Sequence, residues 1–132
     1  MNQQEIFTYI QKQYPTHPDT ITKSGYPVTI FKNPRTATPY AIFYQPAERT
    51  TFMEVQAEPD MIGNYIEMYH LVPAKHMDQK HWLAVPLDGS VSDSKVLDLL
   101  DMSYDLVDRQ AEADGKIRAD RQATDSTTEE KD

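Results

Sequence analysis

The sequence predicts an α+β fold in which an antiparallel sheet packs with helices, in the approximate order α-β-β-β-α-β-α. Two observations support this class. Stretches near both ends of the chain and in its middle carry apolar residues at helical spacing, and short β-rich runs separated by turn residues lie between them. The runs at 28–55 follow one another too closely for the helical crossovers that a parallel sheet requires.

The first predicted helix covers residues 2–14, with Asn2 as its N-cap and Pro15 as its stop. Strands are then predicted at residues 28–31, 40–44 and 51–55, because each run is rich in β-branched and aromatic side chains. Turns separate them, beginning with the one at residues 24–27. The first helix presents one apolar stripe: Ile6, Phe7, Ile10 and Tyr14.

A second helix is predicted to begin at Pro59 and to end near His70. Residues 71–77 form a connector or a short strand, and residues 81–87 form a strand that ends at an Asp-Gly turn. Ser92 is the expected N-cap of a third helix that ends near Val107. Its apolar face is Val96, Leu99, Leu100, Ser103 and Val107, and the opposite face, expected to be solvated, is Asp98, Asp101, Asp105 and Asp108.

The length of 132 residues fits one domain, predicted at residues 1–110, followed by a tail at residues 111–132. The tail is polar and acidic and lacks the apolar period of the preceding helix, so it is expected to be disordered. The N-terminal residues do not resemble a signal peptide, and no apolar run is long enough to cross a bilayer. A cytoplasmic protein without a membrane partner is therefore expected.

The chain has no cysteine, which excludes disulfides, thiolate zinc sites and a cysteine nucleophile. Its net charge is −8. The tail contributes seven acids and four bases, or −3, so residues 1–110 contribute the remaining −5. Because proteins that bind nucleic acid through phosphates usually present a basic face, this balance argues against, without excluding, a nucleic-acid partner.

Three segments in combination resemble the MmcQ/YjbR family: Lys75-His76-Met77-Asp78-Gln79-Lys80-His81-Trp82, Leu87-Asp88-Gly89-Ser90 and Ser103-Tyr104-Asp105-Leu106-Val107. The resemblance covers roughly residues 2–108. It implies a compact α+β domain of the CyaY-like group, described as a predicted DNA-binding "double wing" protein, and it brings no catalytic residues. Asp78 departs from the asparagine that the family often has. The segment at residues 53–59 also lacks a lysine common in the family, which removes a positive charge from the middle of the sheet.

The best candidate nucleic-acid surface combines bases with an aromatic ring. Such a surface could hold phosphates and stack on bases. In the alternative interpretation, Trp82 is a core residue, and Lys80 and His81 shape the turn into its strand. The candidate residues are Lys32, Arg35, Lys75, Lys80, His81 and Trp82.

Other chemistry has less support in the sequence. His70, His76 and His81, with Asp78, could be imagined as metal ligands, and His76 and His81 have the four intervening residues of a zinc finger. No cysteine pair completes such a site, and alternate residues of a strand point to opposite faces, so no metal or cofactor is predicted. There is no glycine-rich phosphate loop, and Ser103 is interpreted as a small residue at a helix–sheet contact. We therefore expect a protein that is not an enzyme.

Two hypotheses for function remain. The first is a small DNA-binding domain, monomeric or weakly dimeric. The second is a module that binds a protein partner or a small ligand through an aromatic sheet face, for which the eight tyrosines are the main support. Basic residues clustered on one face would favour the first, and scattered bases beside an exposed apolar patch would favour the second.

Overall fold

The computed structural model describes residues 1–125 except residues 15 and 48, and the side chains of residues 111–125 lie outside the description. The fold is α+β, as the sequence predicts. Its elements in chain order are α1 (Gln3–Gln13), β1 (Pro18–Lys23), β2 (Tyr26–Lys32), β3 (Pro39–Tyr44), β4 (Phe52–Gln56), the 3₁₀ turn η1 (Pro59–Met61), α2 (Ile62–Tyr69), β5 (Val72–Pro73), β6 (Trp82–Pro86) and α3 (Asp93–Asp125).

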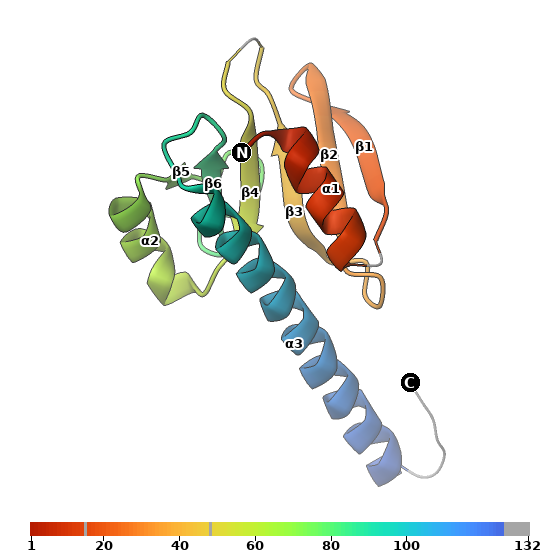
Figure 1. Cartoon of the computed structure of the whole chain (residues 1–132). Coiled ribbons are helices and arrows are strands. Elements are labelled where there is room, and N and C mark those ends of the chain that lie inside the picture. The colour runs from red at the N-terminus through yellow and green to blue at the C-terminus, as the bar shows by residue number, and fades with distance from the viewer. Residues whose placement is uncertain (15, 48, 126–132) are drawn as a thin grey trace.

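The six strands form one sheet in the order β1-β2-β3-β4-β6-β5, and every neighbouring pair is antiparallel. Figure 1 shows α1 and α3 on the same face of this sheet, with α2 beside β5 and β6. We call the face under α1 and α3 the inner face. The main core lies there, where Phe43, Met53 and Leu83 meet Ile10 of α1 and Leu100 of α3, all almost fully buried.

The predicted starts of the first and third helices are confirmed by their caps, whereas the second, predicted to begin at Pro59, has a 3₁₀ turn at Pro59–Met61 and begins at Ile62. Asn2 and Glu5 form a reciprocal capping box, in which each side chain accepts a hydrogen bond from the other residue's backbone N–H, at 2.8 and 2.9 Å. The Ser92 hydroxyl accepts a bond from the Lys95 N–H at 3.2 Å. At the end of α2, His70 adopts the left-handed conformation, with φ 58°, that closes many helices.

The sequence did not predict β1, and it left β5 open between a connector and a strand. All six residues of β1 are exposed, and its polar residues outnumber the apolar ones. A strand at the edge of a sheet buries neither face fully, so it carries no apolar alternation that reasoning from sequence can detect. Pairing with β2 over its whole length is what makes this segment a strand.

The third helix continues to Asp125, well past its expected end near Val107. Residues 111–125 include four alanines and two arginines and contain no proline, so helix propensity can continue the helix where the apolar period stops. The predicted disordered tail at residues 111–132 therefore has helical backbone as far as Asp125. Residues 126–132, the rest of that prediction, lie outside the described residues.

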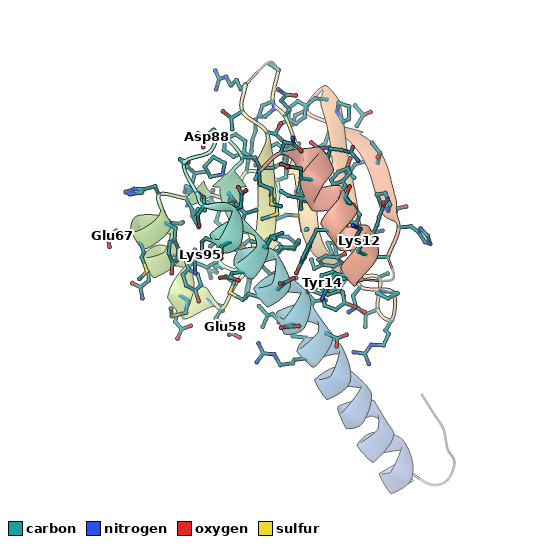
Figure 2. The ribbon with its side chains drawn as sticks, viewed as in Figure 1. Lys12, Tyr14, Glu58, Glu67, Asp88 and Lys95 are labelled. Carbon is teal, nitrogen blue, oxygen red and sulfur yellow. The ribbon has the colours of Figure 1, made fainter. Side chains whose placement is uncertain are left out.

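The prediction that the acidic face of α3 is solvated is wrong for Asp101. Asp101 accepts hydrogen bonds from the phenols of Tyr9, at 2.8 Å, and Tyr14, at 2.5 Å. Figure 2 shows Tyr14 between α1 and α3. Burial and the bond to Asp101 raise the pKa of Tyr9 to about 12, so its proton stays available for this contact. The acidic face thus holds α1 against α3.

Ser103 joins α3 to the sheet, as expected of a small residue at a helix–sheet contact. It is fully buried, and its hydroxyl donates to the Tyr40 carbonyl at 2.6 Å and accepts from the Gln56 N–H at 2.9 Å. The paired register of β3 and β4 begins at the next residues, Ala41 and Val55. The hydroxyl therefore satisfies two backbone groups where the two strands separate.

Replacing Ser103 by alanine removes this bridge and leaves two buried backbone groups without partners. We expect Ser103→Ala to lower the free energy of unfolding by about 2–4 kcal/mol, measured by denaturant unfolding. Ser94→Ala, on the exposed side of the same helix, is the control and should change it by less than about 0.5 kcal/mol. Equal effects of the two changes would contradict the bridging role.

Candidate functional site

The face of the sheet opposite α1 and α3, which we call the outer face, carries a second cluster of buried side chains. Val28, Ile42 and Tyr44 are its buried members, and Phe52 and Met77 pack against them. Along β2, β3 and β4 these positions alternate with those of the inner face, as side chains of neighbouring residues in a strand must. No helix covers this cluster; Met77, from the connection between β5 and β6, does.

A carboxylate in the middle of the outer face holds that connection in place. Glu54 is fully buried in β4. Its two oxygens accept bonds from the Tyr44 hydroxyl at 2.5 Å and from three consecutive backbone N–H groups, those of Lys75 at 2.7 Å and of His76 and Met77 at 3.1 Å. A buried carboxylate is costly unless it is fully hydrogen-bonded, and these four donors meet that need.

Sequence reasoning missed this role of Glu54. It noted only that the segment at residues 53–59 lacks a lysine and so loses positive charge in the sheet. An acidic residue at an alternating position of a half-buried strand was the available signal. The three backbone groups that it binds, however, lie more than twenty residues later in the chain, and no local pattern identifies them.

A row of three rings crosses the outer face at the end of the sheet nearest the β3–β4 turn. The rings of Tyr26 and Tyr44 are 6.1 Å apart and those of Tyr44 and Phe52 are 5.7 Å apart, each pair inclined by only 26°. His76 packs edge-on against Tyr44, and its Nε2 lies 2.7 Å from the Tyr26 hydroxyl. The connection held by Glu54 therefore also braces this aromatic row.

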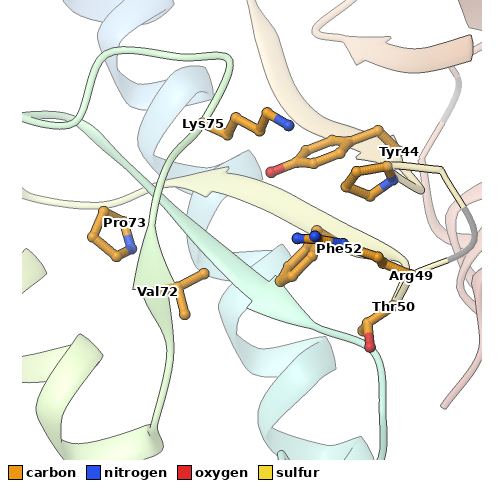
Figure 3. Close-up of a pocket in the computed structure, with 8 residues that line it drawn as sticks. Tyr44, Arg49, Thr50, Phe52, Val72, Pro73 and Lys75 are labelled. Atoms are coloured by element: carbon orange, nitrogen blue, oxygen red, sulfur yellow. The ribbon is translucent and has the colours of Figure 1, made fainter. Parts of the chain in front are cut away.

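A cavity of about 630 Å³ opens beside the aromatic row, between the β3–β4 turn and β5 (Figure 3). In the close-up, Arg49 and Phe52 lie on one side of the cavity, Lys75 extends from the loop above them, and Val72 and Pro73 lie on the opposite side. Its volume is that of a site for a small ligand. The lining residues are Tyr44, Pro46, Arg49, Thr50, Phe52, Val72, Pro73 and Lys75.

The charge of the cavity is opposite to that of the chain. Arg49 and Lys75 are exposed cations, and no carboxylate is among the lining residues that the structure describes. The Lys75 ammonium lies 5.4 Å from the centre of the Tyr26 ring, within cation–π range. Within the described part of the chain, neither cation forms an ion pair. Both charges therefore remain available to an anionic ligand.

Two residues of the predicted nucleic-acid surface are engaged elsewhere. Lys32 lies 3.4 Å from the Asp19 carboxylate, and Arg35 binds Asp108 of α3 at 2.5 Å. The bonds from Asn33 and Arg35 hold the pKa of Asp108 below its usual range. These cations stabilise the β1–β2 and α3 contacts, and they do not line the cavity.

Three further candidates form the turn into β6, as the alternative interpretation expected. Trp82 is 5% exposed and belongs to the core of the sheet. His81 pairs with Asp78 at 2.6 Å, and the Lys80 N–H donates to the same carboxylate at 3.0 Å. The bond to His81 is the main cause of a lowered pKa at Asp78. Of the six predicted site residues, only Lys75 lines the cavity.

Other kinds of site find little support among the described residues. They contain no group of three or more histidine, aspartate or glutamate side chains arranged to hold a metal ion. They also include no helix with the length and apolarity needed to cross a membrane.

Comparison with known proteins places this fold in a recognised group. A family model described as YjbR matches residues 16–106, whereas the curated proteins give no match. A crystal structure from Pseudomonas syringae is 25% identical, with a TM-score of 0.70, covering 80% of this chain and 98% of that one. A DUF419-domain structure from Deinococcus radiodurans is 22% identical, with a TM-score of 0.66, covering 81% and 79%, and it shows the shared fold alone.

Replacing Glu54 by glutamine keeps the shape of the side chain but replaces one carboxylate oxygen by an NH₂ group, which cannot accept a hydrogen bond. The remaining amide oxygen is also a weaker acceptor for the three backbone donors. We expect Glu54→Gln to lower the free energy of unfolding by about 2–4 kcal/mol, measured by denaturant unfolding. Glu58→Gln, at an exposed residue without a side-chain capping bond, should have little effect. A Glu54→Gln protein as stable as the parent would disprove the anchoring role.

His76 should titrate abnormally. Burial, helped by Lys23 and Lys75 and opposed by Glu54, lowers the pKa of its imidazole below 6.5. The unfolded chain therefore binds the proton more readily, and His76 makes the fold lose stability as the pH falls below 6.5. NMR titration should place its midpoint under 6.5.

The pH dependence of stability provides the second measurement. His76→Gln should weaken the loss of stability below pH 6.5, whereas His17→Gln, at an exposed residue, should leave it in place. Asp78, Asp88 and Asp108 also have lowered pKa values, so their protonation likewise destabilises the fold as the pH falls. Only the difference between the two histidine variants is therefore diagnostic. An NMR midpoint at or above 6.5 would contradict the burial of His76.

Proposed function

The chain belongs to the YjbR family, and we propose that this member is a non-enzymatic binding module whose ligand site is the cavity on the outer face. One observation carries the proposal. In a chain of net charge −8, a cavity of about 630 Å³ combines aromatic walls with two cations, and no carboxylate is among its described lining residues. Such a cavity suits a small ligand that is both apolar and anionic.

The lining residues also support a binding role over a catalytic one. Among the described lining residues, Thr50 and Tyr44 supply the hydroxyls, and none is a histidine or a carboxylate that could act as a base toward them. The Tyr44 hydroxyl is already committed to Glu54, and burial and that bond raise its pKa.

Binding of duplex DNA, the activity that the family resemblance implied, is the less favoured proposal. A duplex presents phosphates along both strands, so its protein partners use several free cations spread over one face. Here Lys32, Arg35 and His81 are each paired with an aspartate. This is the scattered arrangement of bases that favours the small-ligand hypothesis.

Titration with 8-anilinonaphthalene-1-sulfonate, an aromatic anion whose fluorescence rises in apolar surroundings, tests the cavity directly. We expect a dissociation constant on the order of 10–100 μM. The double variant Arg49→Gln/Lys75→Gln should bind at least about tenfold more weakly, a loss of about 1.4 kcal/mol. The matched control, Lys12→Gln/Lys80→Gln, changes two exposed lysines away from the cavity and should bind like the parent.

Fluorescence anisotropy with mixed-sequence duplex DNA, at about 50 and 200 mM salt, tests the competing proposal. We expect no strong, salt-dependent binding. Tight binding that is lost in a Lys32→Ala/Arg35→Ala/Lys80→Ala variant would replace the cavity proposal by the DNA-binding one. Dye binding that is insensitive to Arg49 and Lys75 would also overturn the cavity proposal.

A further inference from the structure

The cavity is one of two adjoining hollows. A second hollow, of about 480 Å³, is lined by Ser24, Gly25, Tyr26 and Ala47, and it shares Pro46, Arg49 and Lys75 with the first. The two cations therefore stand between an aromatic compartment and a more polar one. A ligand that fills both compartments would carry its negative charge near its middle.

The first compartment suits a flat ring. Phe52 is half-buried and stacks in the row with Tyr44, while Val72 and Pro73 form the facing wall. Stacking of a base on an aromatic side chain contributes about 1–3 kcal/mol and works with any base. The flanking Thr50 hydroxyl supplies a polar group at the edge of this apolar space.

The shared wall suits a phosphate. An arginine can bind two phosphate oxygens at once, and a lysine adds a mobile point charge. The backbone N–H of Lys75 is fixed to Glu54 at 2.7 Å, and its ammonium lies over the Tyr26 ring. This lysine is therefore held at the boundary between the compartments before any ligand arrives, which reduces the entropy lost on binding.

The second compartment is bounded by a tight turn. Ser24 and Gly25 have φ angles of 56° and 86°, the left-handed pair typical of a two-residue hairpin connection between strands such as β1 and β2. A side chain at Gly25 would point into open space. The turn thus leaves the Ser24 hydroxyl and backbone groups beside the shared cations, where they can contact a sugar or a second polar group.

We infer that the ligand of this site is a mononucleotide unit, with its base against Phe52 and Tyr44 and its phosphate between Arg49 and Lys75. The inference rests on the proposed function and names the ligand class of the same cavity. A free mononucleotide and a nucleotide within a single strand of DNA share this chemistry. The two sources differ in the experiment below.

Isothermal titration calorimetry with adenosine 5′-monophosphate, adenosine and inorganic phosphate separates the two halves of the site. The nucleotide should bind at least about tenfold more tightly than either adenosine or phosphate alone, because only it engages both the rings and the cations. Arg49→Gln and Phe52→Leu should each weaken nucleotide binding at least about threefold. Lys12→Gln should leave it unchanged, and thermal melting should show that each variant is folded.

A single-stranded oligodeoxyadenylate of about ten residues identifies the source. Binding to the oligomer about tenfold tighter than to the mononucleotide, with the same loss in Arg49→Gln, would assign the site to a nucleic-acid strand. Equal or weaker binding to the oligomer, with mononucleotide binding as expected, would assign the site to the free nucleotide. Both results support the inference.

Three results would overturn it. Phosphate binding as tight as nucleotide binding would reduce the site to a simple anion site. Nucleotide binding that is unaffected by Phe52→Leu would show that the base does not bind in the aromatic compartment. If the naphthalene sulfonate binds and neither nucleotide nor oligomer does, the inference fails while the proposed function stands; if the dye also fails to bind, both fail.

Discussion

The hydrogen bonds to the buried Glu54 carboxylate determine the arrangement of the outer face. One side chain in β4 gathers the Tyr44 hydroxyl from β3 and three successive N–H groups from the connection between β5 and β6. The connection contains no helix or strand from Ala74 to His81, and its own described backbone hydrogen bonds lie near its end, where His81 and Trp82 donate to Asp78. Because the carboxylate fixes its start, His76 packs on the aromatic row and Lys75 stands at the cavity.

Acidic side chains have the corresponding role on the other side of the sheet. Asp101 ties α1 to α3 through two phenols, and Asp108 ties α3 to the β2–β3 connection through Asn33 and Arg35. Some of the chain's many carboxylates therefore accept hydrogen bonds that hold its own elements together. Those contacts occupy Arg35, and the ion pair with Asp19 engages Lys32. By contrast, Arg49 and Lys75 at the cavity form no ion pair with a described residue, and the described lining includes no carboxylate.

Most of the candidate site was beyond prediction from the sequence. Lys75 was identified because it lies in a conspicuous motif, but Arg49 follows an ordinary turn, and Phe52 reads as one more strand aromatic. Trp82, by contrast, was predicted as a site residue because bases lie near it in the sequence. It belongs to β6, a strand that lies between β4 and β5, and all five residues of this interior strand are buried.

The sequence by itself determined the elements whose signals are local: the capped starts of α1 and α3, the aromatic run of β3, the proline at the start of η1, and the family motif. Capping, periodicity and turn chemistry act between residues a few positions apart. The tertiary structure alone decided the edge strand β1, the four donors on Glu54, and which cations are paired and which line a cavity. These features depend on contacts between residues far apart in the chain, and the free energy of a buried hydrogen bond or ion pair exists only once the fold has brought its partners together.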